Sequence, residues 1–110
     1  MGRIDRAMIS QPMVGLTDFE IDEARERAFH KLEAMGFEVV NIVFGGEEFN
    51  PANLHNKREV QSIPLYYLAK SLEAMSKCNA IYFCKGWENA RGCKIEHEAA
   101  VEYGLECHYE

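Results

Sequence analysis

Residues 80–104 read AIYFCKGWENARGCKIEHEAAVEYG, and this stretch indicates how the chain folds. Its first five residues are apolar, which is typical of a buried strand. A short segment with a glycine follows, and the residues after it have the spacing of a helix over about 90–103. A buried strand that leads directly into a helix is the building unit of a parallel α/β sheet.

One carboxylate on this predicted helix lies away from the others. Glu98 and Glu102 are four residues apart and share a face, as acids on a solvated face do. Glu96 lies about 200° around the helix from Glu98, beside Cys93 and Ala100. A carboxylate about two turns after the end of a strand lies near the place where open α/β sheets bind ligands. The helix dipole alone also favours an acid in the first turns, so this spacing leaves both interpretations open.

Strand and helix patterns alternate along the rest of the chain. Thr17 and Glu20 form a capping box at the start of one helix, and Ser62 with Pro64 marks the start of another. The predicted elements are a strand at 7–11, a helix at 17–36, a strand at 37–43, a long loop at 44–57, a helix at 62–77, a strand at 79–84, a helix at 90–103 and a strand at 105–109. This alternation predicts a parallel sheet with right-handed crossovers.

The length and composition indicate one globular domain over residues 1–110. The net charge of −6 argues against binding of duplex nucleic acid, because neutralising phosphates requires clustered Lys and Arg. The chain shows no apolar stretch of about 18 residues and no secretory signal, so we expect no membrane partner and a cytoplasmic location. Its four cysteines lack Cys-x-x-Cys spacing and its four histidines are scattered. We therefore expect no metal site and no other cofactor.

Two segments resemble a known family. The first is Ser10-Gln11-Pro12-Met13-Val14-Gly15, and the second is Gly86-Trp87-Glu88 followed by Arg91-Gly92 and Glu96. Together they resemble the nucleoside 2-deoxyribosyltransferase-like superfamily, and within it the small proteins of the DUF4406 type. The resemblance runs from about residue 7 to 107, apart from residues 44–63. It implies a three-layer α/β fold with a flavodoxin/Rossmann-like parallel sheet of four or five strands in the order 2-1-3-4 and helices on both faces. In that order both segments meet at one crevice.

The resemblance also implies a reaction. In this superfamily a carboxylate attacks the anomeric carbon of a nucleoside or nucleoside 5′-monophosphate, and the base leaves. By resemblance, Glu96 is this nucleophile and the protein is an N-glycosidase or deoxyribosyltransferase. The residues expected to contact the substrate are Ser10, Gln11, Pro12, Met13, Gly15, Gly86, Trp87, Glu88, Arg91 and Gly92. Backbone amides of residues 10–15 and the helix start near Thr17 are expected to hold a 5′-phosphate.

For three of these residues the sequence leaves a second interpretation open. Trp87 either stacks on the base or packs against the following helix. Arg91 either contacts the ligand or is a solvated surface cation. Glu88 either caps a helix or accepts a hydrogen bond from the ribose.

The sequence departs from the superfamily pattern at four positions. Met8 stands in place of a Tyr, and Gln11 in place of a Gly. Ser71 and Asn79 stand where the pattern has Asp. A serine hydroxyl does not ionise near neutral pH, so Ser71 cannot handle the leaving base as an Asp does. These departures favour an alternative, a protein that binds a nucleotide-like molecule without converting it. A third possibility, a plain interaction module, leaves the convergence of the two motifs unexplained.

The resemblance implies a second copy of the chain as a partner, because relatives commonly form homodimers in which the neighbouring subunit helps to close the active site. The second predicted helix carries Tyr66, Tyr67, Leu68 and Leu72, more apolar surface than contact with one sheet requires. We therefore expect a homodimer that packs through the second or third helix.

Overall fold

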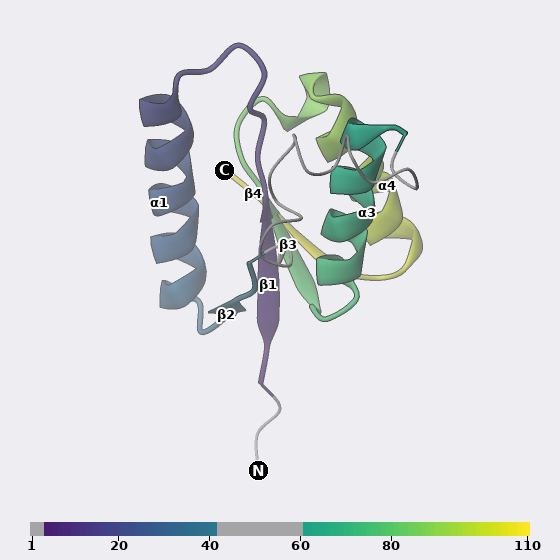
Figure 1. The fold of residues 1–110 in the computed structure, drawn as a ribbon. Coiled ribbons are helices and arrows are strands. Elements are labelled where there is room, and N and C mark those ends of the chain that lie inside the picture. Colours follow the sequence, from purple (N-terminus) through teal and green to yellow (C-terminus); the bar gives the residue numbers. More distant parts are fainter. Residues whose placement is uncertain (1–3, 42–60) are drawn as a thin grey trace.

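A computed structural model describes residues 4–41 and 61–110 of the protein. The chain has an α/β fold with a four-stranded parallel sheet (Figure 1). The strand order is β2-β1-β3-β4, which confirms the predicted order. The elements are β1 (Arg6–Ser10), α1 (Asp18–Ala34), β2 (Glu38–Val39), α3 (Ile63–Met75), β3 (Ala80–Phe83), the 3₁₀ helix η2 (Trp87–Asn89), α4 (Arg91–Glu102) and β4 (Glu106–Tyr109).

The largest difference from the predicted elements concerns β2. The β-branched residues of the segment predict a strand over 37–43, but the paired strand is Glu38–Val39. The Val40 N–H still donates to the carbonyl of Ala7, at 2.8 Å, and the ladder with β1 ends there. The end of the predicted strand and the predicted loop at 44–57 lie outside the described residues. The short helix η2, between β3 and α4, was not predicted.

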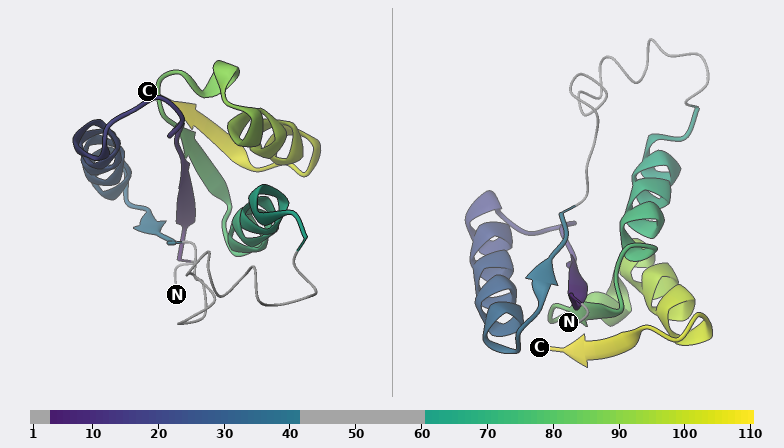
Figure 2. Two further views of the ribbon diagram at one scale, coloured as in Figure 1. Left: turned by 45° about the horizontal axis from the view of Figure 1, so that its top comes forward. Right: turned by 90° about the horizontal axis from the view of Figure 1, so that it is seen from below.

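Each face of the sheet has its own hydrophobic core, because successive strand residues point to opposite faces. The cluster on the α1 side contains Ala7, Ile9, Ala28, Leu32, Ala80, Tyr82 and Cys84. The cluster on the side of α3 and α4 contains Met8, Ala74, Met75, Ile81, Phe83 and Ala100. Figure 2 shows α1 on one side of the sheet, and α3 and α4 on the other. The predicted three layers, with helices on both faces, are therefore confirmed.

Helices α1 and α3 begin with the capping interactions that the sequence predicts. The Thr17 hydroxyl accepts a hydrogen bond from the Glu20 N–H at 3.1 Å, and the Glu20 carboxylate accepts one from the Thr17 N–H at 2.9 Å. The Ser62 hydroxyl accepts a hydrogen bond from the Leu65 N–H at 3.3 Å, and a proline follows in the first turn. Among the described residues, no helix combines the length and the apolar character needed to cross a membrane.

The side chain of Glu110 ties the carboxyl edge of the sheet to α1. Its carboxylate accepts hydrogen bonds from the Lys85 backbone N–H at 2.9 Å and from Arg27 Nε at 3.0 Å. Both hydrogen bonds lower the pKa of Glu110, and the bond from the Lys85 N–H has the larger effect. The turn that follows β3 is thereby held in place at the edge where the strands end.

Candidate functional site

A pocket of about 760 Å³ opens at the carboxyl ends of β1 and β3. The chain passes from β1 to β2 on one side, and β3 lies on the other side, so this is the switch point of the sheet. The two segments that follow β1 and β3 meet here. A Cβ atom added to Gly86 would lie 3.6 Å from Pro12 Cγ. The predicted convergence of the two segments at one crevice is therefore present in the structure.

Glu96 lines this pocket from α4 and is only 7% exposed. The Ser10 hydroxyl at the end of β1 donates a hydrogen bond of 2.6 Å to Glu96 Oε1. Ser71, on α3, is also buried and lines the same pocket. Glu98 and Glu102, on the same helix, are exposed. The angular separation found in the sequence thus distinguishes a buried carboxylate at a pocket from acids on a solvated face.

The surroundings of Glu96 change its proton affinity. Burial raises the pKa of Glu96, because the charged form loses its hydration, while the hydrogen bond from Ser10 lowers it. Cys93 lies one turn earlier on α4, and burial raises the pKa of its thiol as well. A carboxylate that is shielded from bulk water and borders a pocket is suited to act as a nucleophile or a proton acceptor.

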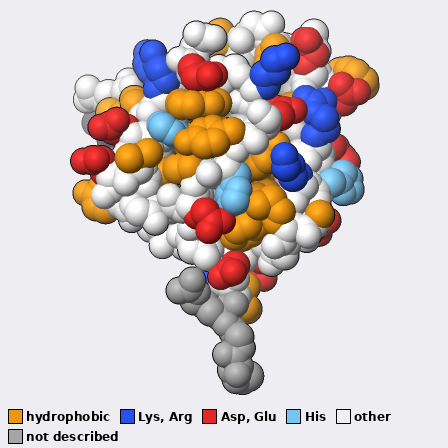
Figure 3. Space-filling view, turned by 180° about the vertical axis from the view of Figure 1, so that it is seen from behind, with side chains coloured by type: hydrophobic (Ala, Val, Ile, Leu, Met, Phe, Trp, Pro, Cys, Tyr) orange, Lys and Arg blue, Asp and Glu red, His pale blue; other side chains and the backbone are white. Residues whose placement is uncertain are grey.

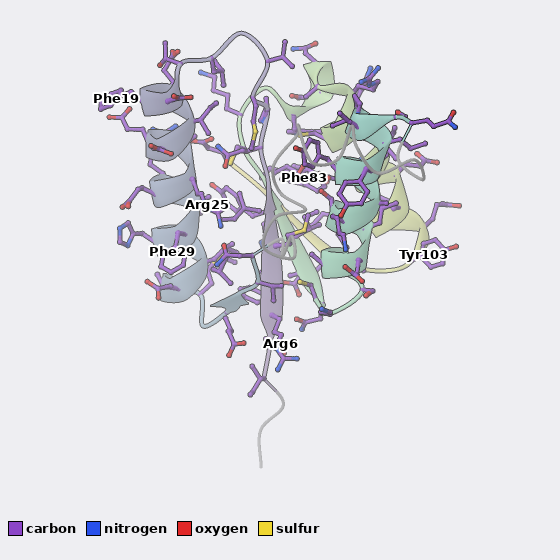
Figure 4. All side chains as sticks on the ribbon, viewed as in Figure 1. Arg6, Phe19, Arg25, Phe29, Phe83 and Tyr103 are labelled. Atoms are coloured by element: carbon purple, nitrogen blue, oxygen red, sulfur yellow. The ribbon has the colours of Figure 1, made fainter. Side chains whose placement is uncertain are left out.

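Three cationic side chains also line the pocket: Arg25 from α1, Lys85 from the turn after β3, and Arg91 at the start of α4. None of them forms an ion pair with a carboxylate among the described residues. The guanidinium of Arg25 donates a hydrogen bond to the side-chain oxygen of Asn41, and Arg25 lies between α1 and the sheet (Figure 4). Three pocket cations that form no ion pair within residues 4–41 and 61–110 favour an anionic ligand, although the chain as a whole carries a net charge of −6.

The two helices that begin near the pocket differ in their capping. The start of α1 is closed by its capping box, its first turn carries Asp18 and Glu20, and Thr17 does not line the pocket. The first residue before α4 is Ala90, which offers no side-chain cap, and Gly92 from the first turn lines the pocket. Unpaired N–H groups attract anions. An anionic group in this pocket is therefore better placed at the start of α4 than at the start of α1, where the sequence suggested it.

The structure brings together most of the residues predicted to form the site. Those that line the pocket are Ser10, Gln11, Pro12, Met13, Gly86, Arg91, Gly92 and Glu96. Those outside its lining are Gly15, Trp87 and Glu88. Gly15 adopts a positive φ of 83° in the turn between β1 and α1, and its neighbours Val14 and Leu16 line the pocket.

Trp87 belongs to an aromatic cluster outside the pocket lining. Its ring centroid lies 4.3 Å from that of His97 and 5.2 Å from that of Phe83. His97 Nε2 in turn lies 2.8 Å from the hydroxyl oxygen of Tyr109. These contacts correspond to the packing interpretation of Trp87. The face of the molecule opposite to the view of Figure 1 carries hydrophobic patches with histidines beside them (Figure 3).

The sequence interpretation missed Arg25 and Lys85, and it treated Ser71 only as the loss of an acid. A signal for Arg25 exists, because it falls between Ile21 and Ala28 on the sheet-facing stripe of α1, where a cation is unusual. Ser71 similarly occupies the buried face of α3. Lys85 carries no local signal beyond its position two residues after the end of β3.

Metal-ligand geometry is absent from the part of the chain that the structure describes. No three His, Cys, Asp or Glu side chains within residues 4–41 and 61–110 are grouped so that they can hold a metal ion. The four cysteines are free thiols, and burial raises the pKa of Cys84 to about 12.

The comparison with known families agrees with one part of the sequence resemblance. The family described as "Domain of unknown function (DUF4406)" matches residues 6–109, which include every strand, every helix and every pocket residue described above. No curated protein and no solved structure matches the chain. The chain belongs to the DUF4406 family.

Proposed function

We propose that the protein is an N-glycosidase or deoxyribosyltransferase that acts on a nucleoside or a nucleoside 5′-monophosphate through Glu96. The observation that carries this proposal is the Glu96 carboxylate itself, which is buried, bonded to the Ser10 hydroxyl and open to a pocket at the switch point of the sheet. The resemblance of both pocket segments to the nucleoside 2-deoxyribosyltransferase-like superfamily supports the same reaction.

In the proposed reaction, a carboxylate oxygen of Glu96 forms a bond to the anomeric carbon of the sugar. The bond between this carbon and the base nitrogen breaks, and the base leaves with the electron pair. Water, or a second base, then attacks the glycosyl ester and releases Glu96 as a carboxylate. The hydrogen bond from Ser10 holds one carboxylate oxygen, so the attacking oxygen is oriented before the substrate arrives.

The cations of the pocket favour the 5′-monophosphate over the uncharged nucleoside. Arg25 and Arg91 enter the lining from α1 and α4, the two helices on opposite faces of the sheet. A phosphate bound between them would also meet the N–H groups at the start of α4. The pocket volume of about 760 Å³ is in the range of pockets that hold ligands of nucleotide size.

A specific observation favours a second candidate, a protein that binds a nucleotide without cleaving it. Within the described residues, Glu96 is the one acidic side chain that lines the pocket. Protonation of a leaving base usually requires a second acid, and the serine at position 71 cannot supply that proton.

The test is incubation of the protein with a panel of nucleosides and nucleoside 5′-monophosphates. Chromatography measures the released base, and native mass spectrometry measures the retained ligand. We expect base release by the wild type, none by Glu96→Gln, and wild-type rates for the control Glu98→Gln, which changes an exposed acid two residues away. Wild-type turnover in Glu96→Gln would contradict the role of Glu96. Retained ligand without any released base would identify the second candidate.

We also propose that the protein is a homodimer. Leu65 and Leu72 are 62% and 37% exposed, and they lie two turns apart on one face of α3. Tyr66, Tyr67 and Leu68 are half-buried beside them. An exposed apolar stripe of this kind is suited to a symmetric contact with the same helix of a second copy.

A further inference from the structure

Strand β4 forms one edge of the sheet. Among the residues that the structure describes, it pairs with β3 alone. The backbone N–H groups of Glu106 and Glu110 donate hydrogen bonds toward β3, at 3.0 and 2.9 Å. Because the backbone groups of successive strand residues alternate between the two sides, those of Cys107 and Tyr109 point away from the sheet. An edge with outward N–H and C=O groups is a template for a further strand.

The two faces of β4 differ in chemistry. Leu105 and Cys107 pack against the core cluster on the side of α3 and α4, and the ring of Tyr109 stacks there on an aromatic residue of β3. On the opposite face, the Glu106 carboxylate is hydrogen-bonded to His108 Nε2, and these side chains are 63% and 25% exposed. The edge therefore carries apolar groups on one face, and an acid with a basic ring on the other.

A second copy that pairs antiparallel with β4 about a two-fold axis has few possible registers. Outward-facing residues must lie opposite one another, so the residue on the axis is Glu106, Cys107 or His108. With Glu106 on the axis, two carboxylates face each other. With His108 on the axis, Glu106 meets Glu110 of the second copy. With Cys107 on the axis, each Glu106 lies opposite His108 of the other copy, so this register alone avoids opposed acids, which destabilise a sheet.

The same register matches the backbone and the apolar face. The Cys107 residues of the two copies exchange two hydrogen bonds, and each Tyr109 N–H donates to the Leu105 carbonyl of the other copy. The Leu105 N–H already donates to the Ala100 carbonyl at 2.9 Å, so it takes no part in this ladder. On the apolar face, Leu105 lies opposite Tyr109, and Cys107 opposite Cys107. Backbone, charge and apolar surface are therefore self-complementary in one register.

We propose that the edge of β4 binds β4 of a second copy, antiparallel and with Cys107 on the two-fold axis, so that two four-stranded sheets join into one. This contact is separate from the contact through α3 and rests on different residues. Residues 105–109 bury less area than a standard interface does, so we expect a dissociation constant on the order of 0.1–1 mM. At micromolar concentration the α3 contact then forms alone.

The first experiment isolates this contact by mass. It uses the full chain with Leu65→Ser and Leu72→Ser, which removes the exposed apolar stripe of α3. Light scattering from about 10 μM to about 2 mM should show a rise from one chain mass to two. A mass that stays at one chain over this range would overturn the proposal.

Amide NMR of the same chain locates the contact. With rising concentration, the amide signals of Cys107 and Tyr109 should shift and their hydrogen exchange should slow, because these N–H groups face outward in the single copy. The amides of Glu106 and His108 face β3 and should keep their exchange rates. Association that leaves the Cys107 and Tyr109 amides unchanged would place the contact elsewhere and overturn the proposal.

Charge substitutions in this chain test the register. Glu106→Lys places a cation opposite His108, and His108→Glu places a second acid opposite Glu106, so each variant should associate with itself about tenfold more weakly than the parent chain does. A mixture of the two variants should associate like the parent, because opposite charges then meet at both positions. One chain that carries both substitutions should associate as well, for the same reason.

The control is Glu33→Lys, the same change at an exposed acid of α1, which should leave the association unchanged. Parent-like self-association of Glu106→Lys would overturn the proposal, because the charges would then not face each other. Failure of both the mixture and the doubly substituted chain to associate, with amide spectra that show folded protein, would overturn it too.

Discussion

Replacement of Glu96 by Gln should remove activity and at the same time stabilise the fold. Gln has the same shape, and its carbonyl oxygen can accept the hydrogen bond from Ser10, so the packing is preserved. The charge is lost. In the wild type, burial raises the pKa of Glu96, so the native state binds a proton at the Glu96 carboxyl more tightly than the unfolded chain does. The associated stabilisation is complete below the unfolded pKa and is lost as the pH rises through the folded pKa.

The size of the effect follows from opposing contributions. Burial of a carboxylate costs several kcal/mol, and the hydrogen bond from the Ser10 hydroxyl returns about 1.5–3 kcal/mol. A net cost on the order of 1 kcal/mol remains in the ionised wild type, which Glu96→Gln removes. For a domain of 110 residues, this corresponds to a Tm about 4 °C higher.

The assay is thermal unfolding of the wild type and of Glu96→Gln, measured by calorimetry at pH 8 and at pH 4.5. We expect the variant to melt at a higher temperature at pH 8 and the two Tm values to approach each other at pH 4.5, where more of the wild-type Glu96 carboxyl is protonated. Glu98→Gln should show no such pH-dependent gain, because Glu98 is exposed. Equal Tm values at pH 8, or a difference that is independent of pH, would refute the view that Glu96 is a desolvated carboxylate.

Three further predictions concern the ligand, the aromatic cluster and the assembly. Arg25→Gln should weaken binding of nucleoside 5′-monophosphates about tenfold and leave nucleoside binding unchanged, as measured by calorimetric titration. An equal loss of affinity for both ligands would argue against a contact between Arg25 and the phosphate. Trp87→Phe should lower the Tm without reducing the ligand-induced rise in Tm, since Trp87 lies outside the pocket lining; loss of that rise would show that Trp87 contacts the ligand. Light scattering at micromolar concentration should give about twice the chain mass of 12.6 kDa, and replacement of Leu65 and Leu72 by Ser should return it to one chain mass; a monomeric wild type would contradict the dimer.

Sequence alone determined the parts of the fold that depend on local chemistry. The capping box of Thr17 and Glu20 lies at the predicted start of α1, since both hydrogen bonds form within one turn of chain. The alternating strands and helices indicated the parallel sheet, because crossover connections admit few other arrangements. The spacing of Glu96 away from Glu98 on α4 likewise follows from helix geometry.

Only the tertiary structure decided which side chains share the pocket. Arg25 lies more than sixty residues from the start of α4 in sequence, yet both line the pocket, and Ser71, which the sequence shows only as a missing acid, lines it together with Glu96. Trp87 follows the pocket residue Gly86 in sequence, but its side chain packs in the aromatic cluster around His97. Burial and hydrogen bonding between distant elements depend on how helices pack against the sheet, and no local pattern in the sequence encodes those distances.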